Sequence, residues 1–251
     1  MIKRIIFIAV MCAFVAAPAM ADTYGTVELR EINVTPQVTM TVYAPGFAGG
    51  IGAYTGVYNL GLQNATITTP NPFGMEGLGD IKNWGFCIEM QYSNSAYRLY
   101  NIVDVEDAPV NLGPPENGVH VPMGDDKADY IRELWAKVNP SPSMSAVNAA
   151  AFQAAVWEIV YEDAQAWDID AWDGSNLNNV SSFKVAGNAS VISQAQTWLN
   201  SLTGSGALAN NIVALSRGDT QDYIVKVPVP AAVLLGMLGF CVAGLKLRKL
   251  A

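Results

Sequence analysis

Apolar and polar residues alternate along much of the first half of the chain, and this pattern predicts β-strands between residues 26 and 69. The region is rich in Thr, Val and Ile, and the Gly, Pro and Asn residues between its apolar runs are typical of turns. Residues 84–92 continue the alternation, which places Cys87 and Glu89 on the same face of a predicted strand. Residues 97–103 are expected to be the hairpin partner of that strand.

A helical period follows a loop predicted for residues 105–122, which contain four prolines. Three helices are expected: one that ends at Val138, before Asn139-Pro140; a second that starts from a cap at Ser143 or Ser145 and runs to about Glu162; and a third across residues 190–202. Strands followed by helices predict an α+β fold, in which a β-rich N-terminal half, sandwich or barrel-like, packs against a helical C-terminal half.

The first residues of the chain have the pattern of an export signal. Lys3 and Arg4 precede a charge-free apolar stretch, and Ala19-Met20-Ala21 offers the small residues that signal peptidase accepts. We therefore expect residues 1–21 to be a signal peptide and Asp22 to be the first mature residue. An uncleaved membrane anchor is the alternative, although the apolar stretch is short for a membrane span.

The last residues form a second three-part pattern. Pro228 and Pro230 precede a stretch without charge, and a cluster of Lys and Arg follows it. The stretch from Val227 to Leu245 has 19 residues, close to the ~20 that a helix needs to cross the hydrocarbon core. We expect one C-terminal transmembrane helix here, with the basic cluster on the cytoplasmic side and residues 22–226 outside. A buried core helix is the alternative, but the stretch lacks a polar face.

This tail resembles the PEP-CTERM sorting signal of Gram-negative bacteria, which has a Pro-x-Pro motif, a hydrophobic helix and a final Arg/Lys cluster. The resemblance implies that an exosortase-type membrane transpeptidase recognises residues 227–251 and removes them. The exported protein would then reach the cell surface or the extracellular matrix. One position departs from the family pattern, because Val229 stands where a Glu is usual between the prolines.

Charge and cysteine content narrow the function classes for residues 22–226. They carry all 22 acidic residues and only nine of the 14 basic ones, a net charge of −13. Such a surface repels phosphate backbones, so nucleic-acid binding is not expected. Cys87 is the only cysteine between the signal peptide and the tail, whereas exported proteins normally use cysteines in pairs. It is therefore an inert buried residue, an intermolecular disulfide partner or a thiol kept for chemistry.

Gln153 is the polar exception on the apolar side of the second predicted helix. Val156, Trp157 and Val160 lie three, four and seven residues after it, so they share its side of the helix. A buried carboxamide without partners costs about 1–3 kcal/mol. The structural explanation for Gln153 is a hydrogen bond to a strand carbonyl.

Together, these two residues resemble the signature of bacterial thioester domains. Phe86-Cys87-Ile88-Glu89 on a strand matches that family's aromatic-Cys-aliphatic-acid motif. Phe152-Gln153-Ala154-Ala155-Val156-Trp157, in which Gln153 follows Cys87 by 66 positions, matches its hydrophobic-Gln-x-Ala-hydrophobic-Trp helix. The resemblance spans about residues 54–202. It implies that the Cys87 thiol attacks the Gln153 carboxamide, expels ammonia and forms an internal thioester.

The resemblance also implies covalent attachment to a surface, because an amine or hydroxyl of an unidentified ligand would displace the sulfur. Each molecule would react once, so the protein is not expected to be an enzyme, and neither a metal nor an organic cofactor is implied. Glu89 is a candidate to accept a proton from Cys87, and Trp157 is a candidate to position the amide. Burial beneath Phe86, Phe152 and Trp157 would shield the bond from water.

Three other functions compete with this one. A cysteine hydrolase needs a base beside Cys87, and His120 is the one histidine of the chain. Residues 168–174 offer three Asp and a Gly, but their spacing misses the EF-hand pattern, and a solvated acidic turn is the simpler explanation. The main alternative is a structural or adhesive matrix protein in which Cys87 and Gln153 are passive core residues.

Overall fold

The computed structural model describes residues 23–44, 47, 49–68, 71–90, 95–111, 120–162, 167–169 and 183–228. The signal peptide predicted for residues 1–21 and nearly all of the tail predicted for residues 227–251 lie outside these ranges. In chain order the elements are β1 (Thr23–Tyr43), β2 (Ile51–Ile67), the 3₁₀ turn η1 (Leu78–Asp80), β3 (Trp84–Cys87), β4 (Arg98–Val103), β5 (Pro109–Asn111), β6 (His120–Pro122), α1 (Asp125–Val138), α2 (Ala146–Tyr161), β7 (Lys184–Ala186), α3 (Ala189–Leu199), β8 (Ile212–Ser216) and β9 (Tyr223–Lys226).

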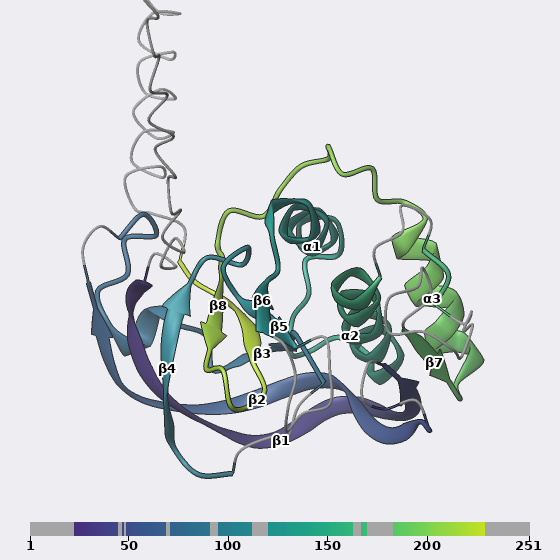
Figure 1. Ribbon diagram of the computed structural model, residues 1–251, viewed down its shortest axis with the longest axis horizontal. Helices are drawn as coiled ribbons and strands as arrows, with labels where there is room; N and C mark the ends of the chain where they lie inside the picture. The colour runs from purple at the N-terminus through teal and green to yellow at the C-terminus, as the bar shows by residue number, and fades with distance from the viewer. Residues whose placement is uncertain are drawn as a thin grey trace, which may run out of the picture.

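One large antiparallel sheet dominates the described structure (Figure 1). Its seven strands follow the order β2-β3-β9-β8-β4-β1-β7, and β1 also pairs with β2. Six of the strands therefore form a closed ring, and β7 extends β1 outside it. β1 and β2 are the longest elements, with 21 and 17 residues, and they run together along the sheet. The ring encloses a core to which strands from both ends of the described chain contribute.

The β-structure predicted for residues 26–69 is confirmed as two long strands. Alternate side chains of β1, including Val27, Leu29, Met40 and Val42, are buried. The partners between them are half-buried or exposed, as a strand with one face on a core requires. Three register shifts interrupt the pairing with β2, so each long strand can curve around the core.

The predicted fold class is wrong, because strands from both ends of the described chain form one large antiparallel sheet and the described residues do not divide into a strand half and a helical half. β8 and β9 follow all three helices in sequence, yet they pair with each other and fill the gap between β4 and β3. The described structure is β-rich with few helices. Both strands are short and almost wholly buried, so they show none of the alternation that marks a half-exposed strand. No helix among the described residues is long and apolar enough to cross a membrane.

The three helices themselves lie where the sequence predicts them, on one side of the β1–β2 pair (Figure 1). α1 ends at Val138, and Asn139 then adopts a left-handed conformation (φ 46°) that closes the helix before Pro140. The side chain of Ser145 caps α2 by accepting a hydrogen bond from the Asn148 N–H. α3 ends three residues earlier than predicted, at Leu199.

Two local predictions are wrong. The strand predicted for residues 84–92 ends at Cys87, and its expected hairpin partner, β4, pairs with β1 and β8 instead. The loop predicted for residues 105–122 contains β5 and β6, which form a separate two-stranded sheet.

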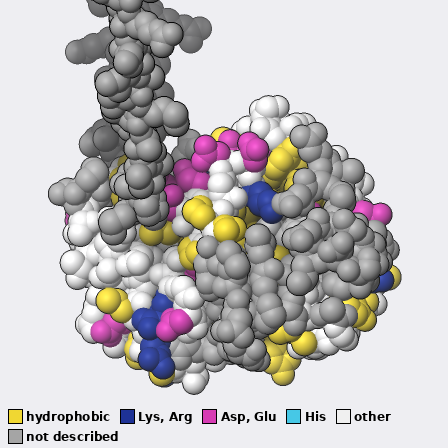
Figure 2. All heavy atoms as spheres, viewed as in Figure 1, with side chains coloured by type: hydrophobic (Ala, Val, Ile, Leu, Met, Phe, Trp, Pro, Cys, Tyr) yellow, Lys and Arg dark blue, Asp and Glu magenta, His cyan; other side chains and the backbone are white. Residues whose placement is uncertain are grey.

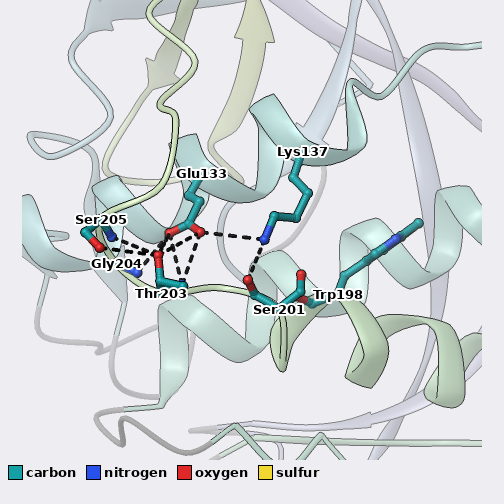
Figure 3. A network of polar contacts seen from close by, with 7 residues as sticks. All are labelled: Glu133, Lys137, Trp198, Ser201, Thr203, Gly204 and Ser205. Atoms are coloured by element: carbon teal, nitrogen blue, oxygen red, sulfur yellow. Dashed lines mark hydrogen bonds and ion pairs between the residues drawn. The ribbon is translucent and has the colours of Figure 1, made fainter.

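The carboxylate of Glu133, on α1, holds the segment that follows α3 (Figure 3). Glu133 is buried and accepts hydrogen bonds from Thr203 N at 3.1 Å, Gly204 N at 2.8 Å and the Thr203 hydroxyl at 3.2 Å. Burial opposes ionisation, but the N–H donors of Thr203, Gly206 and Gly204 outweigh it and hold the pKa of Glu133 below its ordinary value. Lys137 lies 3.7 Å from the same carboxylate and also bonds the Ser201 carbonyl.

Glu133→Gln is expected to lower the free energy of unfolding by about 2 kcal/mol, because the amide turns N–H groups toward buried backbone donors. Urea denaturation near neutral pH measures this loss. Lys137→Met is the matched control, since its half-exposed ion pair is worth at most about 1 kcal/mol. Equal losses in the two variants would contradict the anchoring role of Glu133.

The described surface carries its charge unevenly. On the face shown in Figure 2, acidic side chains gather in one group near the middle of the view. Among the ion pairs of the described residues, Arg132 on α1 pairs with Asp104, Glu106 and Asp129. A smaller group of basic side chains on this face lies next to acidic ones, and Arg217 pairs with Asp219. The described residues on this face therefore form no basic stripe that would suit a phosphate backbone.

Candidate functional site

Cys87 is the last residue of β3, the strand that lies between β2 and β9 in the closed ring. Its neighbour in β9 is Tyr223, and Gly85, two residues earlier, pairs with Val225. A Cβ at Gly85 would lie 2.3 Å from the Ile224 carbonyl oxygen, so only glycine lets β3 approach β9 this closely. Cys87 is fully buried as a free thiol.

Gln153 comes from α2, whose residues are all buried from Ala149 to its end at Tyr161. A helix that is apolar on every side is expected at the centre of a core. α2 contacts α1 and α3 as well as β1, β2 and β3, so it lies between the helical layer and the strands. Gln153 is therefore a fully buried carboxamide that faces the end of β3.

The structure brings Cys87 and Gln153 together. Gln153 Oε1 accepts a hydrogen bond from the Cys87 N–H at 2.8 Å, and Gln153 Nε2 donates one to the Cys87 carbonyl at 2.8 Å. The carboxamide thus makes the two hydrogen bonds to the Cys87 N–H and carbonyl that a neighbouring strand would otherwise make. This is the bond to a strand carbonyl that a purely structural glutamine would make, and it also holds the carboxamide against the residue that carries the thiol.

Side chains also explain why β3 stops at Cys87. Gln153 occupies the main chain of Cys87, and the Tyr161 hydroxyl accepts a hydrogen bond from the Met90 N–H at 2.6 Å. Between them, the Ile88 N–H bonds the Asp222 carbonyl. The expected alternation of faces is lost, because residues 86–90 are all buried.

The Cys87 sulfur lies among hydrogen-bonding groups. It donates to the Glu89 carbonyl at 2.7 Å and accepts from Gln221 Nε2 at 2.6 Å. Burial raises the pKa of the thiol well above its ordinary value; Trp157 lowers it, the negative charge of Glu89 raises it, and Gln221 lowers it. Burial prevails, so the resting group is a neutral thiol.

The two supporting residues predicted from sequence both lie near this thiol. Glu89 is fully buried, and the group that accepts the S–H bond is its main-chain carbonyl, not its carboxylate. Trp157 lies close enough to lower the pKa of Cys87, yet its Nε1–H has no hydrogen-bond partner of standard geometry in the described structure.

The predicted aromatic shield is divided between two places. The rings of Phe86 and Phe152 pack against each other with centroids 4.4 Å apart, and both meet Trp135 edge-on. This cluster joins β3 to α1 and α2. Trp157, by contrast, lies beside the sulfur and lines a pocket.

That pocket reaches the neighbourhood of Cys87 from the surface. Its volume is about 210 Å³, and Trp157, Met90, Tyr58, Gln221 and Glu31 are among its lining residues. Tyr54, which is 61% exposed, also lines it. Cys87 itself does not line the pocket, so lining residues such as Trp157 and Gln221 separate the thiol from it.

Sequence reasoning missed the polar residues around the sulfur, Tyr58, Gln221 and Tyr223. Burial raises the pKa of the Tyr58 hydroxyl well above its ordinary value, as do the nearby Cys87 and Glu31, while Gln221 lowers it. Gln221 and Tyr223 follow Cys87 by more than 130 positions, in a segment whose only visible signal was a short apolar run.

The competing sites gain no support. No group of His, Cys, Asp or Glu within the described ranges could hold a metal ion, and most of residues 168–174 lies outside those ranges. His120 is on β6 of the small sheet, whereas Cys87 is on the large one. Comparisons with protein-family models, curated proteins and solved structures found no match.

Proposed function

We propose that this protein attaches itself covalently to a surface through an internal thioester between Cys87 and Gln153. The observation that carries the proposal is the pair of 2.8 Å hydrogen bonds between the Gln153 carboxamide and the main chain of Cys87. They hold the Gln153 carboxamide against the main chain of the residue that carries the thiol, inside a fully buried site. We expect the protein to attach to amine or hydroxyl groups on a target surface that an exported protein can reach.

Formation of the thioester needs no external reagent. Sγ of Cys87 attacks Cδ of Gln153, the C–S bond forms, and the C–N bond breaks. The nitrogen leaves as ammonia after taking up the proton that the thiol loses, so atoms and charge balance. The reaction is acyl transfer in which the protein is its own acyl donor.

The main chain of Cys87 supports this step. Its N–H donates to Gln153 Oε1, the atom that gains negative charge in the tetrahedral intermediate. A fixed donor at such a position stabilises the developing negative charge and is commonly worth about 10²- to 10³-fold in the rate of acyl transfer. The pocket beside Trp157 and Gln221 offers a route for ammonia to leave and for a nucleophile to enter.

A second function is favoured by the same contacts. Both polar atoms of Gln153 are paired with the main chain, and the Cys87 S–H has an acceptor. A surface protein without thioester chemistry would need nothing more of these residues. The two functions differ in covalent structure, so a chemical test separates them.

Incubation of the purified protein with methylamine tests the proposal. The thioester predicts that methylamine adds at Gln153 and that Cys87 becomes open to alkylation after denaturation, both mapped by peptide mass spectrometry. Cys87→Ala is expected to take up no methylamine. A wild-type protein whose Gln153 stays unlabelled, and whose Cys87 is alkylated equally with and without methylamine, would favour the structural function instead.

A further inference from the structure

Two buried N–H groups from distant parts of the fold converge on the Cys87 sulfur. Gln221 Nε2 lies 2.6 Å from Sγ, and the Trp157 indole lies beside it. Gln221 precedes β9, whereas Trp157 belongs to α2, so the two groups approach the thiol from different elements. Both also line the pocket that leads in from the surface.

The orientation of Gln221 is fixed by its other contacts. The Tyr223 hydroxyl lies 3.3 Å from Gln221 Oε1 and 3.1 Å from a carboxylate oxygen of Glu31. The Glu89 carbonyl, which can only accept a hydrogen bond, lies 3.4 Å from Gln221 Nε2. The end of the side chain that faces this carbonyl and the sulfur is therefore the N–H₂ group.

Trp157 gives a second, independent observation: its indole N–H is a buried donor for which a negatively charged sulfur would be a suitable acceptor. The Trp157 side chain is buried, and its Nε1–H makes no hydrogen bond of standard geometry with any described residue. Such a donor carries a desolvation cost that native proteins rarely leave uncompensated. A sulfur that gains negative charge would be a much better acceptor than the neutral thiol.

We propose that the N–H groups of Gln221 and Trp157 stabilise the Cys87 sulfur as a thiolate, both when the thioester forms and when it opens. In opening, the amine nitrogen bonds to Gln153 Cδ and the C–S bond breaks. The sulfur leaves with the bonding electron pair and finally takes up the proton that the amine loses. The same two donors face the sulfur in both directions of the exchange. This assignment rests on the proposed thioester.

Gln221→Met tests the first donor. Met has a similar length and no N–H, while Tyr223 keeps Glu31 and the Cys87 S–H keeps the Glu89 carbonyl as partners. The rate at which methylamine opens the thioester is followed by intact mass, only on molecules that carry the bond. This rate is expected to fall about 10- to 100-fold, as for loss of a hydrogen bond to a charged group. A folded variant that never forms the bond supports the same assignment.

Trp157→Phe tests the second donor and keeps an aromatic ring in place, so the assignment stays testable if Gln221→Met does not fold. Its opening rate is expected to fall at least several-fold. The matched control is Gln196→Met, because the Gln196 amide on α3 bonds the Trp167 carbonyl and the Asn200 side chain just after α3. It makes no contact with the sulfur. The control is expected to react at the wild-type rate.

The failures are distinguishable. If the wild-type protein reacts with methylamine but the Gln221 and Trp157 variants react equally fast, this assignment falls and the thioester stands. If the variants only melt at a lower temperature and their opening rates are unchanged, the two residues are structural, which also overturns it. If the wild-type protein forms no thioester, the proposed function fails and takes this assignment with it.

Discussion

Replacing Gln153 by Glu is expected to abolish thioester formation completely. A carboxylate has no ammonia to release, so the mass of the variant should match its sequence and methylamine should not add. The change also sets a carboxylate oxygen against the Cys87 carbonyl, where Nε2 now donates at 2.8 Å. This exchange in a fully buried site is expected to cost about 3 kcal/mol of unfolding free energy.

A matched substitution separates chemistry from stability. Gln196→Glu changes a half-buried glutamine that also bonds main-chain groups, of Trp167 and Ile169, but away from the thiol. We expect that variant to keep the thioester. A Gln153→Glu protein that still lost ammonia would place the acyl group on another residue and would remove Gln153 from the account.

Asp222→Asn is expected to stabilise the protein above neutral pH by an amount that disappears in acid. Asp222 is fully buried between Gln221 and Tyr223, and one of its oxygens, Oδ2, has no partner among the described residues. Burial raises its pKa to about 7; the Arg217 N–H and Ser216 lower it, and Asp219 raises it. The folded protein therefore holds this proton at pH values where the unfolded chain has released it.

The sign of the pH dependence follows from that difference. As pH rises from about 4 to about 7, the unfolded chain loses the proton first, so stability falls, by a total on the order of 4 kcal/mol. Asn mimics the neutral acid and keeps an oxygen for the Arg217 N–H, which now bonds Asp222 at 2.6 Å. The variant should thus lack this part of the pH dependence.

Urea denaturation at pH 5 and pH 8 gives the change in unfolding free energy with pH for each protein. The change is expected to be larger in the wild type than in Asp222→Asn. Asp219→Asn is the control, because the Arg217 hydrogen bond lowers the pKa of that largely exposed carboxylate and its loss should matter little. Wild-type and Asp222→Asn profiles that ran parallel would show that Asp222 is ionised in the folded protein.

The sequence predicted most accurately what depends on local patterns. Asn139-Pro140 placed the end of α1 correctly, and Ser145 with the apolar period placed α2 within a residue or two, because caps and periodicity act over one or two turns. The resemblance to thioester domains paired Cys87 with Gln153, and the structure places the Gln153 carboxamide on the main chain of Cys87; the thioester itself stays a prediction.

The pairing of strands that are far apart in the sequence could not be predicted from local patterns. β8 and β9 are short and buried on both faces, so their residues give no alternation, and only closure of the ring reveals them as strands. Because Gln221 and Tyr223 reach Cys87 through β9, missing that strand also meant missing the groups around the sulfur. β3 was predicted too long because side chains of α2, not another strand, bond its end.

The intact mass of the freshly purified protein decides whether Cys87 and Gln153 are joined covalently. A thioester makes the protein lighter than its sequence mass by one ammonia, and the Cys87→Ala variant is expected to have its own full sequence mass. A wild-type protein at its full sequence mass, with a Cys87 thiol that alkylates quantitatively once unfolded, would contradict the thioester.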